Sequence, residues 1–456
     1  MAGIGFELRR ILSRDTFSSQ VRAYLYAALI SAGPWMLSIL CIAVLGLFRG
    51  AGMNQHAHEV FRATTTLTYA LSLILVGGVQ LVATRFLADK LYINKPEHSL
   101  SAFFTAATLV LAIGLPMEFF LLEGFQLPLL YKLVAVVLFG IISLVWLGMI
   151  VLSAVKDYTS IVMAFVAGTV GSIAGAFTFG SWFGFVGFFT GYTTGQVLLF
   201  FWLLARMLAE FRPAGIWDAE LLSYFGKYWE LGLVGLLYNA AIWSDKMVFW
   251  TAPDARLIAP WFHTHDLYEA PVFYAYLSVV PMMSIFLVRI ETTFYEHYRN
   301  YYGRILDRSP LRAIVEERYG MVRALKLSLR DVFISQGSLT LLCIVFTPDI
   351  AALTRLDPLQ ISILRIALLG AFLQALFSLV MVILFYFDLR REVLILSIIF
   401  LVSNTGLSWA SIQLGQQWYG YGYCYACLIS LLSGYFLLSR NLDRLEYITF
   451  ARQPIV

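Results

Sequence analysis

The stretch 130–155, LYKLVAVVLFGIISLVWLGMIVLSAV, contains a single charged residue, Lys132, which lies near its start. The hydrocarbon core of a bilayer requires roughly 20 mostly apolar residues for a helix to cross it. This run is therefore long and apolar enough to span a membrane. The whole chain of 456 residues agrees, because 60% of it is hydrophobic and 13% is charged, whereas a soluble domain has about 25% charged residues. The sequence predicts an all-α polytopic membrane protein.

The same criterion, applied along the chain, predicts twelve membrane-spanning helices. They lie at 23–48, 61–87, 101–123, 130–155, 158–182, 184–208, 228–251, 268–289, 331–347, 359–387, 392–413 and 418–439. The first run is too long for the apolar core of a signal peptide, which has about 7–15 residues. We therefore expect it to remain as a transmembrane helix.

The distribution of basic residues gives the orientation. Cytoplasmic loops of membrane proteins carry an excess of Lys and Arg. With the amino terminus in the cytoplasm, most of the 32 Lys and Arg residues fall in loops on the cytoplasmic side. If one span had been missed, every later loop would lie on the opposite side of the membrane, and the excess of basic residues on the cytoplasmic side would be lost. The distribution of Lys and Arg therefore favours twelve spans with both termini in the cytoplasm.

Twelve spans divide naturally into two halves of six. Because six is even, the halves would have the same orientation and form two pseudo-symmetric six-helix bundles related by an axis along the membrane normal. We expect a cytoplasmic amphipathic amino terminus at 1–22, a first bundle at 23–210, a cytoplasmic linker at 211–227, a second bundle at 228–440 with a cytoplasmic insertion at 291–331, and a cytoplasmic tail at 441–456.

Two outer loops have a weakly similar sequence, which supports a duplication of one six-helix half. One reads His56-Ala-His58-Glu59 before the second span, and the other reads His263-Thr-His265-Asp266 before the eighth. If these loops meet, their imidazoles and carboxylates could bind a metal ion. Polar loops of this kind usually bind none, and we expect no metal site.

The insertion at 291–331 is the longest polar segment. Apolar residues recur in it at helical spacing beside basic ones, which predicts one or two amphipathic helices at the cytoplasmic surface. Such a surface either rests on anionic lipid or binds a cytoplasmic partner. The candidate docking residues are Arg312, Arg318, Arg323, Lys326 and Arg330.

Several function classes lack their usual residues. Cys424 and Cys427 have no second Cys or His pair nearby, so they favour packing over a zinc site. The sequence contains no Gly-x-x-x-x-Gly-Lys-Ser/Thr phosphate-binding loop. No histidine lies inside a predicted span, where a membrane acyltransferase would need its base. We expect no enzymatic activity and no cofactor.

Charged and strongly polar residues inside predicted spans are candidates for a transport pathway, because burying a charge in a membrane is costly. In the segment AIWSDKMVFW (241–250) two charges are adjacent among aromatic residues, which suit the stacking of sugar rings. The pathway candidates are Asp245, Lys246, Arg365, Glu118, Trp243, Tyr238 and Gln374.

The adjacent charges Asp245 and Lys246 raise a question of geometry. Neighbours on a helix point about 100° apart, so we expect that they do not face each other. At least one would then need a partner on another span, or water in a cavity between the halves, lined by spans one, two, seven and eight. A structural ion pair to another span remains the alternative.

The twelve-span layout resembles the multidrug/oligosaccharidyl-lipid/polysaccharide (MOP) flippase superfamily. More narrowly, the opening MAGIGFELRRIL (1–12) and the segment SAGPWM (31–36) of the first span resemble the PelG family, the inner-membrane transporters of the Pel exopolysaccharide system. The resemblance extends over the full length. These motifs have no assigned chemistry, so no site residues are carried over.

The resemblance implies export of Pel, an N-acetylgalactosamine-rich polymer, across the bacterial inner membrane for the biofilm matrix. In that family the transporter works with the cytoplasmic glycosyltransferase PelF and with the membrane proteins PelD and PelE. Two alternatives stay open. One is a cation-coupled multidrug exporter of MATE type, and the other is a scaffold of a polysaccharide synthase that transports nothing itself.

Overall fold

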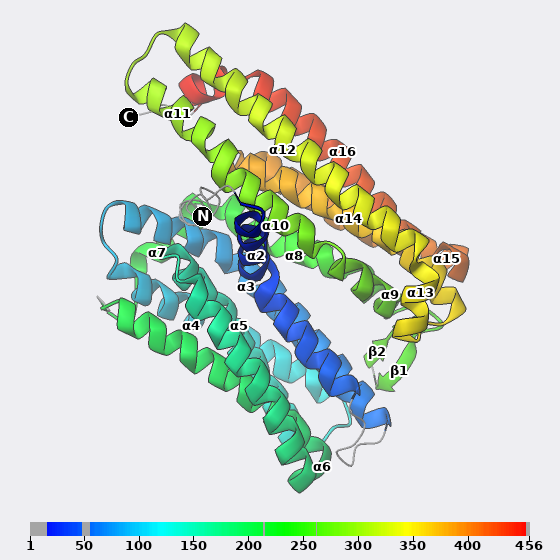
Figure 1. The fold of residues 1–456 in the computed structure, drawn as a ribbon. Helices are drawn as coiled ribbons and strands as arrows, with labels where there is room; N and C mark the ends of the chain where they lie inside the picture. Colours follow the sequence, from blue (N-terminus) through cyan, green and yellow to red (C-terminus); the bar gives the residue numbers. More distant parts are fainter. Residues whose placement is uncertain (1–15, 48–54, 213–214, 261, 453–456) are drawn as a thin grey trace. The chain divides into compact units, whose positions relative to one another are not determined.

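The computed structural model describes residues 16–47, 55–212, 215–260 and 262–452 (Figure 1). The motif at 1–12 and most of the expected amino-terminal segment lie outside these residues. The chain packs into two units. Unit I is Gly33–Asp266, and unit II is Leu267–Val456 together with the described residues before Gly33.

Unit I consists of helices followed by one small hairpin. Its elements are the later part of α2 (Phe17–Leu47), α3 (Gln55–Tyr92), α4 (His98–Glu123), α5 (Leu129–Ala154), α6 (Tyr158–Glu210), α7 (Ala219–Lys227), α8 (Trp229–Phe249), β1 (Arg256–Ala259) and β2 (Phe262–Thr264). Helix α3 packs against α4, α5 and α8, and α5 also packs against α4 and α6. One core cluster gathers around Phe86 and Phe103, and another around Phe61 and Phe188.

Helix α6 is two spans joined at a sharp kink. Gly184 adopts φ 62° and ψ −142° there, which a residue with a side chain rarely adopts. The two arms fold back on each other so closely that a Cβ on Gly175 would lie 2.6 Å from the Gly191 carbonyl oxygen. The glycines of predicted spans five and six therefore allow close helix packing, as small residues do in membranes.

Asp157 joins the two ends of α6. Its carboxylate caps the helix by accepting a hydrogen bond from the Ser160 amide (3.1 Å) and also accepts one from Arg206 Nη2 (2.8 Å). Partial burial works against ionisation, but these hydrogen bonds outweigh it and lower the pKa of Asp157. The two arms are thus held together at their open ends by a charged hydrogen bond.

The strands β1 and β2 form an antiparallel hairpin in which Arg256 lies opposite Thr264. The sequence predicted only a loop in this region. Ile258 and Phe262 of the hairpin are buried in the core of unit I, where Phe262 stacks on Phe125 with ring centroids 4.6 Å apart. Burial of these two side chains stabilises a hairpin that would otherwise be too short to persist.

Unit II is also helical. Its elements are the first part of α2, α9 (Asp266–Leu277), α10 (Val280–Arg289), η1 (Ile290–Phe294), α11 (Tyr295–Leu306), α12 (Leu311–Val345), α13 (Thr347–Thr354), α14 (Pro358–Tyr386), α15 (Arg390–Leu414), η2 (Gln416–Trp418), α16 (Tyr421–Asp443), α17 (Leu445–Tyr447) and η3 (Ile448–Arg452). Helix α14 packs against α12, α15 and α16 and is the most buried span.

Two helices of unit II differ from the prediction. Predicted span eight is broken between α9 and α10, and Gln336 Nε2 donates a hydrogen bond to the Ser278 carbonyl oxygen exposed by the break (2.9 Å). The polar insertion and predicted span nine are not separate, because α12 runs without interruption from Leu311 to Val345. A continuous helix needs no cap or turn at the membrane boundary.

Within the described residues, nine helical segments are long and apolar enough to cross a membrane. Helix α6 contributes two crossings because of its kink, while α2 and α8 match predicted spans one and seven. The twelve predicted crossings are thus all represented by helices. The packing units do not coincide with the predicted halves, because α8 packs against α3 in unit I. The division at 211–227 therefore stays a prediction about internal symmetry.

Candidate functional site

Helices α3 and α8 are in backbone contact where they cross. A Cβ on Gly235 would lie 1.9 Å from the Gly77 carbonyl oxygen, and one on Gly77 would lie 2.5 Å from the Gly235 carbonyl oxygen. The two helices run antiparallel, since the earlier residue Gly232 of α8 meets the later part of α3 at Gly78 and Val82. Small residues permit such an approach, and it fixes α8 on α3.

Asp245 and Lys246, on α8, form an ion pair with each other. The Lys246 ammonium lies 3.0 Å from both Asp245 carboxylate oxygens and 3.1 Å from the Ile242 carbonyl oxygen. Our prediction that neighbours on this helix cannot face each other was wrong, because the flexible lysine side chain folds back over the preceding turn. The Asp245 side chain is fully buried, and that of Lys246 is 12% exposed.

Aromatic side chains accompany the pair. The Lys246 ammonium lies 5.8 Å from the centre of the Trp243 ring, within the range of a cation–π interaction. Tyr238 lies two turns earlier on α8 and is half-buried. The structure thus places four of the predicted pathway residues on one helix.

Glu118, on α4, is a second buried carboxylate of unit I. Its side chain is fully buried, and its Oε1 accepts a hydrogen bond from Thr68 on α3 (2.9 Å). Among the described residues, Oε2 has no hydrogen-bond partner. An ionised carboxylate in a buried position requires a counter-charge or several donors. Thr68 alone does not supply this, so an ionised Glu118 would have too few donors to balance its negative charge.

Asp245 and Glu118 lie at about the same height along unit I. At 1.5 Å per residue, Asp245 is about 15 Å beyond the Gly77–Gly235 crossing, which corresponds to a position near Thr68 on the antiparallel α3. Thr68 is the residue that binds Glu118. Both buried acids therefore belong to one polar layer of unit I, offset from the crossing toward the start of α3.

Helix α3 contributes a row of buried hydroxyls to this layer. Thr64, Thr68 and Ser72 are each fully buried and recur at intervals of four residues, which places them on one helix face. The sequence analysis considered charged, strongly polar and aromatic residues, and it missed this row of hydroxyls. The spacing of the three hydroxyls was the available signal.

Gln374 and Arg365, the remaining pathway candidates, lie on α14 of unit II. Gln374 is buried, and its Oε1 accepts hydrogen bonds from Tyr276 (2.9 Å) and Tyr423 (2.6 Å). Arg365 is exposed, about two turns after the start of α14. Gln374 therefore anchors a polar network of three helices, which the sequence alone did not reveal, while Arg365 is not part of it.

The predicted docking residues lie on α12 in different surroundings. Arg318 forms an ion pair with Glu446 near the carboxyl end (2.9 Å), and its side chain is only 15% exposed. Arg312, Arg323, Lys326 and Arg330 are exposed. Arg318 therefore holds the carboxyl-terminal segment against α12, whereas the other four are accessible.

The predicted histidine loops are brought together without forming a metal-ligand group. Ion pairs join Glu59 to Arg256 (2.7 Å) and Arg62 to Asp266. Within the described part of the chain, one group of ligand atoms lies close enough to hold a metal, and it consists of His98, Asp218 and Glu220. His98 is hydrogen-bonded to Asp218 (2.7 Å), and Lys90 is paired with Glu220. These contacts indicate that the group holds the linker segment 211–227 in place, and we do not assign a metal ion to it.

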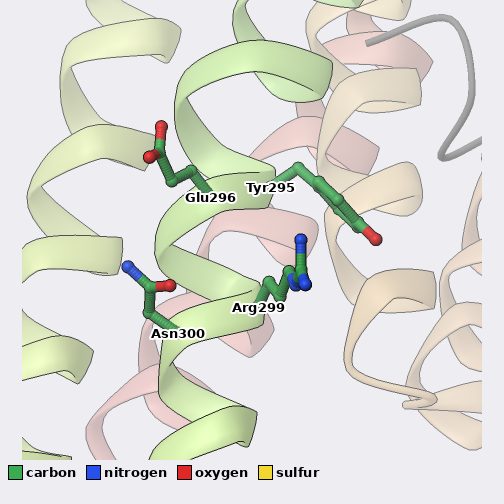
Figure 2. A pocket seen from close by; sticks show the side chains of 4 residues that line it. All are labelled: Tyr295, Glu296, Arg299 and Asn300. Atoms are coloured by element: carbon green, nitrogen blue, oxygen red, sulfur yellow. The ribbon is translucent and has the colours of Figure 1, made fainter. Parts of the chain in front are cut away.

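A depression of about 210 Å³ lies on α11 and is lined by Tyr295, Glu296, Arg299 and Asn300. Figure 2 shows Tyr295 and Arg299 on one side of the helix and Glu296 and Asn300 on the other. The four side chains do not converge on one point. We therefore do not assign a ligand to this depression.

Comparison with known families decides the class of protein. The model of the family described as "PelG: Putative exopolysaccharide Exporter (EPS-E)" matches residues 1–450. The chain belongs to the PelG family. No curated protein matches the sequence of this chain.

Solved structures show the fold of this PelG-family chain. An outward-facing multidrug resistance MATE family transporter of the MOP superfamily has a TM-score of 0.65 at 18% identity, covering 92% of this chain and 96% of the other. An inward-facing one has a TM-score of 0.64 at 16% identity, covering 91% and 99%. A MOP superfamily transporter from Pyrococcus furiosus has a TM-score of 0.61 at 17% identity, covering 92% and 96%.

Sequence identities this low show a shared fold but give no information about the substrate. The predicted all-α, MOP-type fold is confirmed. Family and fold together make this PelG-family chain a multi-pass membrane transporter of the exopolysaccharide-exporter type.

Proposed function

We propose that this chain exports Pel, an N-acetylgalactosamine-rich polysaccharide, across the bacterial inner membrane, with both termini in the cytoplasm and with no enzymatic step of its own. The observation that carries the proposal is the family match over residues 1–450. The MOP-type fold supports it, because that fold belongs to transporters.

For the polymer pathway we propose Asp245 and Lys246, with Trp243 and Tyr238 beside them. A buried ion pair that also touches an aromatic ring offers hydrogen bonds to hydroxyl groups and a flat apolar surface to a sugar ring. Glu118, Gln374 and Arg365 are proposed with less support. Glu118 and Gln374 are buried among their own helices, and Arg365 is exposed near a helix end.

For partners we propose the cytoplasmic glycosyltransferase PelF and the membrane proteins PelD and PelE. Helices α11 and α12 lie side by side and form a hairpin, and we call the segment 304–319 its tip (Figure 1). The tip exposes Leu306 (66%), Leu311 (64%) and Tyr319 (63%) beside Arg312. Exposed aromatic, apolar and Arg residues together are typical of protein interfaces.

The tip is also remote from the bilayer. Arg330 lies where the exposed face of α12 changes from basic to apolar, and Leu311 is 19 residues earlier, about 29 Å along the helix. A partner in the cytoplasm can reach this segment without approaching lipid. We therefore propose that Arg312 and Tyr319 contact the glycosyltransferase.

The double variant Arg312→Glu/Tyr319→Ala should reduce co-purification of PelF at least tenfold. The reason is that an aromatic or Arg anchor in an interface contributes about 2 kcal/mol or more, and the reversed charge repels the complementary surface. Pull-down from detergent-solubilised membranes measures the effect. The matched control, Arg323→Gln/Lys326→Gln, alters the same helix nearer the membrane and should retain the enzyme. Unchanged co-purification of the first variant would rule out the tip as the docking site.

Transport itself can be tested in inverted membrane vesicles that contain PelF and this chain. Supplied with nucleotide-activated N-acetylgalactosamine, they should accumulate polymer that is protected from an added glycosidase inside the lumen. Vesicles without the chain should make polymer that stays accessible. If polymer stays accessible although the chain is present, the scaffold alternative replaces export. If the chain instead drives ion-dependent accumulation of small cationic drugs with no need for PelF, the MATE-type alternative holds.

A further inference from the structure

One face of α12 is exposed along nearly the whole helix, and its chemistry changes partway. Toward the carboxyl end it is apolar, with exposed side chains at Phe333 (55%), Ile334 (57%), Leu341 (65%), Leu342 (55%) and Val345 (68%). Toward the amino end the exposed side chains include Arg312, Tyr319, Arg323, Lys326 and Arg330. Eight of these residues follow one another at intervals of three, four or seven and so form one stripe on one helix face: Arg312, Tyr319, Arg323, Lys326, Arg330, Ile334, Leu341 and Val345. Phe333 and Leu342 are their immediate neighbours on the helix.

The change from apolar to basic marks the edge of the membrane. Exposed apolar side chains from Phe333 onward are stable against lipid tails, and the same helix is apolar enough to cross a bilayer. Arg330 is the first exposed cation on that face. Because the stripe is continuous, the face that carries Arg330 points over lipid and not toward the interior of unit II.

Helix geometry then places Arg330 and Lys326 within the lipid headgroup layer and Arg323 just beyond its outer edge, within reach of a long side chain. Lys326 and Arg323 lie about 6 and 10 Å beyond Arg330 along the helix. A bilayer's headgroup region adds about 5–8 Å on each side of the hydrocarbon core. Arg312, about 27 Å from Arg330, lies well outside that layer.

The two outer cations of this group are available for a ligand. Among the residues that the structure describes, no acidic side chain forms an ion pair with Arg323 or Lys326. Arg330 lies 3.0 Å from Asp331, which is shared with Arg289 (2.9 Å), yet the Arg330 side chain is still 62% exposed. The cluster therefore has a net positive charge that faces the headgroup layer.

We propose that Arg323, Lys326 and Arg330 form a binding site for the headgroup of an anionic phospholipid in the leaflet beside the α11–α12 hairpin. This site is distinct from polymer export and from the docking of a synthase. Leu327, 42% exposed between the cations, packs against the glycerol region of the same lipid. The bound lipid would hold the base of the hairpin at the membrane surface and leave the tip free for a protein.

Native mass spectrometry of the purified full chain tests the proposal. Short-chain phosphatidylglycerol and phosphatidylcholine are titrated into the detergent-solubilised protein at a fixed ionic strength. The variant Arg323→Gln/Lys326→Gln should raise the Kd for phosphatidylglycerol at least tenfold, since each basic residue contributes about fivefold to anionic lipid binding. Phosphatidylcholine binding should not change.

Two further variants make the result specific. Arg308→Gln/Arg312→Gln removes the same charge from the tip and should leave the phosphatidylglycerol Kd within twofold of wild type. Arg323→Lys/Lys326→Arg keeps the charges and should retain binding, which also shows that substitution here does not unfold the protein. Equal weakening by the tip variant would mean that only net charge matters, and the site would be rejected. It would equally be rejected if Arg323→Gln/Lys326→Gln released PelF while phosphatidylglycerol binding stayed the same.

Discussion

The variant Asp245→Asn should lower both the abundance and the melting temperature of the protein, because it leaves the Lys246 ammonium without the carboxylate that lies 3.0 Å away. Breaking a buried ion pair by removing one partner costs about 3–5 kcal/mol. Lys246→Met should have a similar effect, because the buried Asp245 carboxylate loses the ammonium that lies 3.0 Å away. The measurements are size-exclusion profiles and melting temperatures in detergent.

The double variant Asp245→Asn/Lys246→Met separates a structural role from a role in transport. Removing both charges leaves neither one uncompensated, so abundance and melting temperature should return close to wild type. If the pair lines the polymer pathway, secretion should still fall at least tenfold. Wild-type secretion by the stable double variant would show that the pair is only structural.

A matched control uses an exposed ion pair of the same unit. Arg85 and Asp89 lie 3.3 Å apart on α3 with side chains 40% and 36% exposed. Such surface pairs contribute about 0–1 kcal/mol. Arg85→Met/Asp89→Asn should therefore change neither melting temperature nor secretion appreciably.

Gly235→Leu should abolish the folded protein, and Gly235→Ala should already lower its melting temperature. In an ordinary helix Gly→Ala stabilises by about 1 kcal/mol. Here the new Cβ would lie 1.9 Å from the Gly77 carbonyl oxygen, so α8 must move away from α3. Forcing atoms into a packed interface costs about 1–3 kcal/mol or more, and this cost exceeds the gain in helix propensity.

Gly226 on α7 provides the control for this prediction. A Cβ at Gly226 meets nothing within 4 Å, so Gly226→Ala should leave the melting temperature unchanged or raise it. A raised melting temperature for Gly235→Ala would contradict the backbone contact between α3 and α8. The pair of variants thus tests helix packing independently of any transport assay.

Sequence reasoning located most of the membrane-spanning helices closely. Predicted span ten at 359–387 is α14 (Pro358–Tyr386), and span eleven at 392–413 is α15 (Arg390–Leu414). It failed where a boundary depends on tertiary context. The later part of the insertion and span nine became the single helix α12, because no proline interrupts this segment and the helix accommodates Gly320 and Gly337.

The candidate site was predicted only in part. The charges on α8 and α4 could be recognised in the sequence because charged residues are rare in apolar runs. Their partners could not be predicted. The Lys246 side chain folds back onto Asp245, Thr68 of α3 binds Glu118, and Glu446 takes Arg318 out of the set of accessible docking residues.

The sequence by itself determined that this is a polytopic helical membrane protein with twelve crossings, because the length and hydrophobicity of each segment are local properties set by the thickness of the bilayer. Only the tertiary structure decided that α8 packs on α3 and that its charges share a layer with Glu118. Those relations depend on how closely two distant backbones approach at Gly77 and Gly235. Close approach is a property of the pair of helices, and neither segment specifies it alone.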